Sequence, residues 1–382
     1  MQEKTQNHHI VLVGGGHAHA VLLRLWAKHP LPGVRLTLVS PETHGLYTGM
    51  LPGLVAGHYT ANDAYIDLSR LCRAAGAHFI RARACGIDAT GRRLDLDNQA
   101  ALHYDLLSLD IGAAAPRDLP GAALANPVKP VGQFYQHWQQ LQQEIQHSST
   151  PLRLGVIGGG AGGCELAMAM AEGLRAHCRS DRVQIHLVHS GQQLPAGYPP
   201  LARALVAREL RRLPVSVHRN WPVAAIERGA VISTDGRRLP LQRLLLAAGA
   251  SAPAWLSNTG LALDEQGFIL VDDTLRAQGC DTIFAAGDAA SFARRPLPKA
   301  GVYAVRQGPV LFHNLRAALT QTPLRRFRAQ RHFLSLLSCG GRRAVATRNG
   351  LALCGAAMWY WKDHIDRAFV RGFRELSLRD RR

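Results

Sequence analysis

The chain has 382 residues, of which 47% are hydrophobic and 19% are charged. This length and composition exclude a small disulfide-stapled domain and a disordered chain, and they favour two domains of ordinary size. The formal net charge of +18 favours an anionic partner, such as a phosphorylated cofactor or an acidic lipid surface. The basic residues occur as scattered pairs without a recognisable nucleic-acid module, so nucleic acid is not an expected partner.

The cysteines and the N-terminal segment indicate in which cellular compartment the protein is expected. The seven cysteines include no CxxC pair, which predicts neither a disulfide framework nor a zinc site and suits a reducing cytoplasm. No signal-peptide pattern precedes the first glycine loop, and no segment approaches the ~20 apolar residues of a membrane-spanning helix. We therefore expect a cytoplasmic protein without a membrane span.

Two similar strand–glycine–helix–strand units follow one another along the chain. The first comprises an apolar strand at 9–13, glycines at 14–16, a helix at 18–28 and a strand at 34–39. The second comprises a strand at 152–157, glycines at 158–160, a helix at 161–177 and a strand at 183–188. Such a repeat predicts two parallel α/β units, each with a phosphate site at a helix N-terminus.

Later segments close the two units. Residues 104–112 and 239–249 each predict a buried closing strand, the Ala/Pro-rich stretch 113–120 predicts a crossover, and residues 282–288 predict a further strand that ends on a Gly-Asp turn. We predict an α/β fold of two Rossmann-like domains, the second inserted in the first, plus a small C-terminal cap. The predicted bounds are 1–113 with 253–330 for the first domain, 114–252 for the second and 331–382 for the cap.

The two glycine loops differ in quality. Gly158-x-Gly160-x-x-Gly163 has glycine at all three positions that a dinucleotide pyrophosphate site uses, whereas Gly14-x-Gly16-x-x-His19 has a histidine at the third. Either loop alone could be a structural glycine turn. Two such loops, each after a strand and before a helix, favour two dinucleotide sites.

The ribose partners are unusual in both units. An acidic residue normally follows the second strand, where it binds a ribose 2′-hydroxyl. In the first unit Ser40 stands there with Glu42 just beyond, and in the second unit His189 and Ser190 stand there without an acid. The absence of an acid removes repulsion against a 2′-phosphate, so NADH and NADPH both remain open.

Five motifs carry a resemblance to a known family. They are GGG near the N-terminus, YDLLSLDIGAAAP, VIGGGAGGCELA, IFAAGDAAS and PKAGVYAVRQG. In this order they resemble the FAD-dependent pyridine nucleotide-disulfide oxidoreductase superfamily over residues 8 to 375. Within it the chain looks most similar to type II NADH dehydrogenases and to the flavoprotein domain fused to selenide, water dikinase.

The resemblance implies which residues hold each cofactor. The implied FAD positions are Gly14, Gly15, Gly16, His17, Ala18, His19, Ser40, Glu42, Met50, Leu51, Pro52, Ala84, Gly112, Gly287, Asp288, Ala300, Gly301 and Val302. The implied NADH or NADPH positions are Gly158, Gly160, Ala161, Gly163, Glu165, His189 and Gly249. A carboxylate at a strand end suits sugar hydroxyls, although Asp288 could also be an ordinary Asx turn.

Two residues are predicted to act in electron transfer. Lys299, with the amides of residues 300–302 at a helix N-terminus, is predicted to raise the flavin potential. Gln307 is what remains of the family's quinone-side pattern. No metal is predicted, because the histidines of residues 8–19 lack carboxylate or cysteine partners and suit turn packing better.

The cysteines argue against two related activities. Residues 45–53 lack the close cysteine pair of the disulfide reductases, which excludes disulfide reduction by that route. Cys164 and Cys339 do not match the positions used by sulfide:quinone oxidoreductases, and we expect them to be small buried hydrophobes.

The C-terminal helix predicted over residues 358–376 separates aromatic from basic residues. Trp361, Ile365, Phe369 and Phe373 recur at i, i+4, and the other face carries Lys362, Arg367, Arg371 and Arg374. This pattern predicts peripheral contact with the inner face of the cell membrane. A helix packed on the flavin domain and a homodimer contact are the alternatives.

The preferred function is that of an FAD-dependent NAD(P)H dehydrogenase which passes electrons to a quinone or another small redox acceptor. One alternative is a flavoprotein that acts on a sulfur or selenium compound. The other is a flavin-binding partner subunit without robust turnover.

Overall fold

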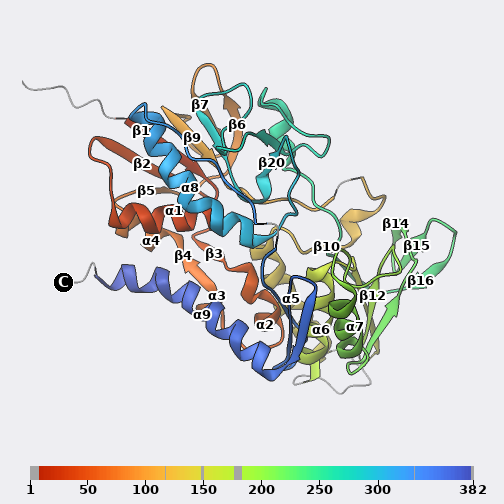
Figure 1. Ribbon diagram of the computed structural model, residues 1–382. Helices are drawn as coiled ribbons and strands as arrows, with labels where there is room; N and C mark the ends of the chain where they lie inside the picture. Colours follow the sequence, from red (N-terminus) through yellow and green to blue (C-terminus); the bar gives the residue numbers. More distant parts are fainter. Residues whose placement is uncertain (1–7, 117, 148–149, 176–182, 331, 380–382) are drawn as a thin grey trace, which may run out of the picture.

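The computed structural model describes residues 8–116, 118–147, 150–175, 183–330 and 332–379 (Figure 1). The last two residues of the helix predicted over 161–177 lie outside these ranges, as do residues 1–7 of the predicted first domain. The rest of the chain builds two parallel sheets with helices packed on them, which confirms the predicted α/β class.

The first sheet has five parallel strands in the order β19-β9-β1-β2-β5. Its strands are β1 (His8–Val13), β2 (Val34–Val39), β5 (His78–Ile80), β9 (Leu106–Leu109) and β19 (Ile283–Ala285). The helices packed on it are α1 (His17–Lys28), α4 (Leu68–Ala74) and α8 (Gly301–Leu319). Burial along β1 from His9 onwards and along all of β9 explains why these strands are predominantly apolar.

The second sheet repeats this plan in the order β10-β17-β11-β12-β13. Its strands are β10 (Asn126–Pro127), β11 (Leu152–Ile157), β12 (Val183–Val188), β13 (Val215–His218) and β17 (Arg243–Leu246), and its helices are α5 (Val131–His147), α6 (Ala161–Arg175) and α7 (Pro200–Leu210). The single strand predicted over 239–249 is wrong in its bounds. The segment divides at buried Leu241 between β16 (Arg238–Pro240) and β17, which belong to different sheets.

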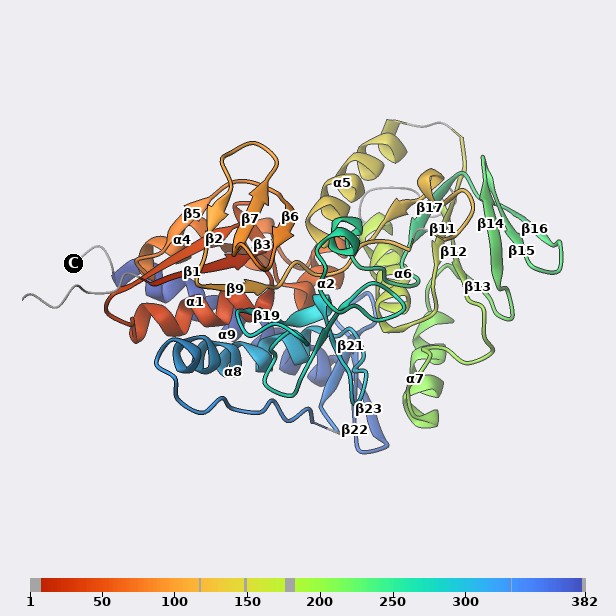
Figure 2. The same ribbon diagram turned by 90° about the horizontal axis from the view of Figure 1, so that it is seen from above.

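The chain leaves the first sheet after β9, builds the second sheet and returns at β19, as the inserted arrangement predicted (Figure 2). The outgoing and returning segments lie side by side, because Ala114 and Ser251 exchange backbone hydrogen bonds of 2.8 and 3.0 Å. Each segment begins at a left-handed glycine, Gly112 with φ +69° and Gly249 with φ +68°. This pairing supports proposed domain boundaries near residues 113 and 252.

Smaller elements complete the fold. The two-stranded sheets are β3 (His44–Leu46) with β4 (Tyr65–Asp67) and β18 (Ile269–Val271) with β20 (Ala290–Phe292). The three-stranded sheets are β6 (Ala84–Asp88), β7 (Arg93–Leu96) and β8 (Leu102–His103); β14 (Val223–Glu227), β15 (Ala230–Ser233) and β16; and β21 (Ser335–Ser338), β22 (Ala344–Arg348) and β23 (Leu351–Gly355). The short helices are η1 (Thr48–Met50), α2 (Leu51–Val55), α3 (Ala61–Ala64), η2 (Ala122–Leu124), η3 (Ala254–Asn258) and η4 (Gly287–Ala289).

The C-terminal helix α9 (Ala356–Arg379) follows β23 and runs back along the molecule towards α4 (Figure 1). It packs against α3 and α4 of the first part, while β21, β22 and β23 pack against α6 and α7 of the second, so the cap contacts both parts of the protein. Among the described residues, none of the helices combines the length and the hydropathy needed to cross a bilayer.

The prediction that α9 has an aromatic face and an opposite basic face is only partly confirmed. Trp361 and Ile365 are exposed, but Phe373 is buried and Phe369 stacks on Tyr47 at 4.5 Å between ring centroids. Residues at i, i+4 advance by about 400°, so a stripe of four residues winds about 120° around a straight helix. Lys362, predicted on the basic face opposite the aromatic residues, is therefore buried with the inward-facing part of the helix.

Candidate functional site

The first glycine loop lies against the end of β9. Gly14 has φ +93°, and a Cβ there would collide with the Asp110 carbonyl. Gly16 N donates to that carbonyl at 3.2 Å, and His17 begins α1 one residue later. Asp110 follows β9 with its buried carboxylate at the start of α1, where it accepts from His19 N at 3.0 Å.

His19 replaces the third glycine with a structural contact. Its imidazole is fully buried; Nδ1 contacts the Gly14 carbonyl at 2.7 Å, and Nε2 contacts Ser108 Oγ at 2.8 Å. Because a carbonyl only accepts, Nδ1 carries the proton and Nε2 accepts from the hydroxyl. The side chain thus joins the glycine loop to β9, and burial lowers its pKa.

Three further segments meet beside the α1 N-terminus. Thr48 N donates to His17 Nε2 at 3.4 Å. A Cβ on Gly301, the first residue of α8, would lie 3.3 Å from Thr48 Oγ1. Gly287 has φ +64°, and a Cβ added there would collide with the Asp110 carboxylate. The predicted residues of the glycine loop, the Gly-Asp turn and the α8 N-terminus are therefore brought together.

Asp288 in the Gly-Asp turn has a partner that the sequence analysis missed. Lys129 Nζ lies 2.7 Å from Asp288 Oδ2, and both side chains are partly buried. Lys129 precedes α5 in the inserted unit, 159 residues away in sequence. No local spacing signals such a pair, because only the return of β19 beside β9 brings the turn to this place.

The two predicted electron-transfer residues have structural contacts. Gln307 is buried, and its Oε1 accepts from Gly287 N at 2.6 Å, so it positions the Gly-Asp turn. Lys299 donates to the Ala290 carbonyl at 2.9 Å and lies 3.6 Å from the Phe268 ring centroid. Burial, opposed by nearby Asp288, lowers the pKa of Lys299 to about 8. Its predicted effect on the flavin potential stays a proposal.

The remaining predicted FAD positions lie around this site in different ways. Ser40 is buried, and its hydroxyl both donates to and accepts from the backbone of Glu42, which leaves the exposed Glu42 carboxylate as the freer ribose acceptor. Met50, Leu51 and Pro52 are buried, and Met50 and Leu51 pack in the cluster that includes α6. Ala84 is the buried first residue of β6.

The second glycine loop has an open face. Gly158 has φ +126°, its N–H donates to the Val188 carbonyl at 2.8 Å, and a Cβ on Gly163 would collide with the Gly158 carbonyl. These contacts place α6 close to β11. A Cβ on Gly160 would meet nothing within 4 Å. The loop thus offers backbone amides and free space where a pyrophosphate needs both.

Glu165, half-buried and predicted at the nicotinamide site, belongs to a charged cluster around the buried Lys362 and Asp366. Its Oε1 accepts from Ser338 N at 2.7 Å. Lys362 Nζ on α9 donates to Asp366 Oδ2 and to the Gly49 carbonyl, each at 2.6 Å. Burial raises the pKa of Glu165 to about 7, although nearby Lys362 opposes the shift. We call Glu165, Lys362, Asp366 and Tyr47 the buried cluster, since Tyr47 hydrogen-bonds Asp366.

The cysteine positions agree with the small-hydrophobe interpretation. Cys164 and Cys339 are both buried, and burial raises the pKa of Cys164 to about 12. No cysteine lies in η1 or α2 beside the first loop.

Known proteins match the chain along most of its length. The ferredoxin–NAD(+) reductase component of the biphenyl dioxygenase system of Paraburkholderia xenovorans is 30% identical over 302 residues, which cover 75% of this chain and 68% of that protein. The demethylphylloquinone reductase NdbB of Synechocystis sp. is 25% identical over 365 residues, which cover 91% of this chain and 88% of that protein. The solved sulfide:quinone oxidoreductase of Aquifex aeolicus shares the fold, with a TM-score of 0.81, 18% identity and coverage of 97% and 92%.

The pyridine nucleotide-disulphide oxidoreductase family matches residues 8–308. This range includes both glycine loops, the Gly-Asp turn and the first turns of α8, which are the motifs that carried the predicted resemblance. The chain belongs to the pyridine nucleotide-disulphide oxidoreductase family.

Proposed function

We propose that the protein is an FAD-dependent NAD(P)H dehydrogenase that passes electrons to a quinone. The observation that carries the proposal is the pair of glycine loops, each at the N-terminus of a helix, with Asp288 and the α8 N-terminus beside the first. Demethylphylloquinone reductase and sulfide:quinone oxidoreductase, both named for a quinone, support this acceptor class.

The first site suits FAD. The amides at the start of α1 would hold its pyrophosphate, and Asp288, oriented by Lys129, would accept from its sugar hydroxyls. The N-terminus of α8 at Gly301 offers a positive dipole end to a reduced flavin. When bound, FAD supplies hydride acceptance and electron release, and the chain needs no nucleophile for either.

The second site suits a nicotinamide nucleotide. The open face of the loop at Gly160 and the first amides of α6 would hold the pyrophosphate. His189 follows β12 in the place where a ribose lies in such folds. The loop 47–50 connects the first site to the buried cluster, because Thr48 contacts His17 and the Gly49 carbonyl accepts from Lys362.

The buried cluster has a role in proton supply. Reduction of a quinone by NAD(P)H takes up one proton besides the hydride. Glu165, whose pKa burial raises to about 7, can hold or release that proton near neutral pH. Its neighbours Lys362 and Asp366 extend the cluster towards Tyr47, which lies edge-on to His17 at 5.4 Å.

A quinone in the bilayer requires contact with a membrane surface. β23 and the first turns of α9 follow one another in the chain (Figure 2), and both elements carry exposed apolar side chains. We call this set the C-terminal apolar patch: Leu351 (74% exposed), Leu353 (67%), Tyr360 (56%), Trp361 (46%) and Ile365 (38%). Among the described residues, five of the seven exposed large hydrophobic side chains fall on these two consecutive elements, which suits insertion among headgroups.

Quinone-dependent oxidation of NADH and NADPH by the purified protein tests the proposal. We expect turnover with a soluble quinone analogue and retention of FAD through purification. Turnover with a ferredoxin and with no quinone would instead indicate a ferredoxin partner, as in the name of the Paraburkholderia relative. Absence of NAD(P)H oxidation with every acceptor would favour a flavin-binding partner subunit. Reduction of the flavin by sulfide or selenide would favour a flavoprotein that acts on a sulfur or selenium compound.

A further inference from the structure

The end of β12 lies against the second glycine loop and carries no carboxylate. The β12 terminus at Val188 accepts from Gly158 N at 2.8 Å. The next residue, His189, places its ring over Gly159, where any added Cβ would collide with the imidazole. In dinucleotide folds an acidic residue at this strand end binds the 2′-hydroxyl of the adenosine ribose. Its replacement by an imidazole changes the chemistry offered to the ribose.

The surroundings of His189 are positive rather than negative. Its Nε2–H donates to the Gln193 carbonyl at 3.0 Å, which fixes the ring. Burial lowers the pKa of His189, and the nearby charge of Arg219 lowers it further. Within the ranges that the structure describes, residues 189–193 make no hydrogen bond or ion pair with a carboxylate.

Backbone contacts hold Arg219 beside this strand end. Trp221 N donates to the His189 carbonyl at 2.9 Å, and Asn220 N donates to the Gly191 carbonyl at 3.1 Å. Arg219 directly precedes these two anchored residues and is exposed. No described carboxylate forms an ion pair with it, so its guanidinium can bind an anion from solvent.

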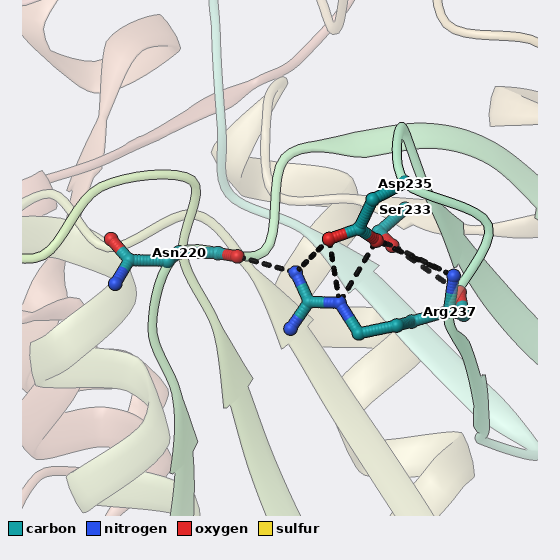
Figure 3. Close-up of polar contacts among 4 residues, drawn as sticks. All are labelled: Asn220, Ser233, Asp235 and Arg237. Atoms are coloured by element: carbon teal, nitrogen blue, oxygen red, sulfur yellow. Dashed lines mark hydrogen bonds and ion pairs between the residues drawn. The ribbon is translucent and has the colours of Figure 1, made fainter.

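A second arginine nearby is already engaged. Figure 3 shows Arg237 bound by the Asp235 carboxylate and by the Asn220 carbonyl, and the closest of these contacts is 2.6 Å, to Asn220 O. Its guanidinium also lies 4.3 Å from the Trp221 ring centroid. Arg237 therefore supports the wall of the site, while Arg219 retains its capacity for a ligand.

We infer that the second site selects NADPH over NADH through Arg219 and Ser190. A 2′-phosphate needs donors and positive charge, which the Arg219 guanidinium and the exposed Ser190 hydroxyl supply. A 2′-hydroxyl needs a carboxylate acceptor, which this strand end lacks. The inference rests on the proposed function, because it assigns the nucleotide of the same second site.

Binding of two adenosine fragments to the purified flavoprotein tests this inference without turnover. Adenosine 2′,5′-bisphosphate carries the 2′-phosphate, and 5′-AMP lacks it. By isothermal titration calorimetry we expect the bisphosphate to bind at least about tenfold more tightly, since one charge-assisted contact distinguishes the two. Arg219→Ala should remove most of this difference while 5′-AMP affinity stays unchanged. Ser190→Asp, on an exposed side chain, should reverse the preference.

Arg238→Ala is the matched control, because Arg238 is an exposed arginine on β16 that pairs with Glu227 on β14. It should leave both affinities unchanged. Equal affinities of the wild type for the two fragments, or an Arg219→Ala variant that keeps the difference, would overturn the inference. In that case NADH oxidation with a quinone would still support the proposed function. Failure of both fragments to bind would count against the second site itself.

Discussion

At the scale of residues, the proposed FAD site holds two carboxylates close together, and each needs a hydrogen-bond donor or a positive charge to stabilise it. Asp110 and Asp288 both lie near His17, and a pyrophosphate would add further negative charge. Asp110 is stabilised by the His19 amide at the start of α1, and Asp288 by Lys129. The site therefore depends on a lysine from the inserted unit to balance a turn in the first unit.

Lys129→Met should weaken FAD binding by about tenfold, because it leaves the Asp288 carboxylate unpaired beside the phosphates. Fluorescence titration of the apoprotein with FAD measures the dissociation constant. Lys28→Met, at the exposed end of α1, is the control and should change nothing. Unchanged FAD affinity in Lys129→Met would remove Lys129 from the site.

His19→Ala should lower the free energy of unfolding by about 2–4 kcal/mol, because it leaves a cavity and frees the Gly14 carbonyl and the Ser108 hydroxyl. Urea denaturation followed by circular dichroism gives the value. His44→Ala, on a mostly exposed side chain, should cost under about 0.5 kcal/mol. Equal losses in the two variants would mean that His19 does not hold the loop.

Glu165 should make stability depend on pH. Its pKa in the folded protein, about 7, lies above the ordinary value of 4.5, so the folded state binds the proton more tightly. Stability is then full at low pH and falls as pH rises between these two values. Glu165→Gln stays neutral, so relative to the wild type it should gain up to about 3 kcal/mol between pH 5 and 8.

Urea denaturation at several pH values checks this expectation. Glu172→Gln, a partly exposed glutamate on the same helix, is the control and should follow the wild type. A Glu165→Gln variant whose stability difference from the wild type is constant across this range would contradict a raised pKa of Glu165 in the folded protein.

The residue scale also marks where sequence reasoning stopped. The glycines, Asp288 and the α8 N-terminus were predictable, because local turn chemistry and helix starts demand those residue types. Lys129, Asp110 and the grouping of Glu165 with Lys362 and Asp366 were missed, since each joins elements distant in the chain. His19 was noticed as a departure from the glycine pattern, but only its two hydrogen bonds reveal why it stands there.

At the scale of elements, α9 shows how far a periodic pattern can be trusted. The pattern predicted the helix itself, and the structure extends it to Ala356–Arg379. The predicted faces failed because the stripe winds around the helix and because Lys362 has Asp366 and Gly49 as buried partners. The outward part of the stripe remains available, and it joins Leu351 and Leu353 of β23.

The double change Trp361→Gln with Ile365→Gln should reduce binding to vesicles with anionic lipid by about tenfold or more, because it removes two apolar side chains from the C-terminal apolar patch. Co-sedimentation measures the bound fraction. His364→Gln, between the two on the same exposed face, is the control. Equal pelleting of the double variant and the wild type would contradict a membrane role for the patch.

At the scale of the whole molecule, the repeated glycine units predicted the architecture well. Period and spacing predicted two parallel α/β units. The strands predicted over residues 104–112 and 282–288, which the structure has at 106–109 and 283–285, flank the insertion. The bounds near residue 241 were wrong, because one apolar run serves two different sheets. Local patterns could not predict how the two sites lie relative to each other. Their arrangement depends on the backbone pairing of Ala114 with Ser251 and on where α9 packs.

The central claim is that one site holds FAD and the other delivers hydride to it. Anaerobic titration of the purified protein with NADPH, followed by flavin absorbance, tests this most directly. The account predicts stoichiometric bleaching and return of the absorbance on addition of a quinone. It also predicts that Gly160→Val, which fills the open face of the second loop, abolishes bleaching by NADPH while dithionite still reduces the flavin. Absence of bound flavin, or equal bleaching of the variant by NADPH, would contradict it.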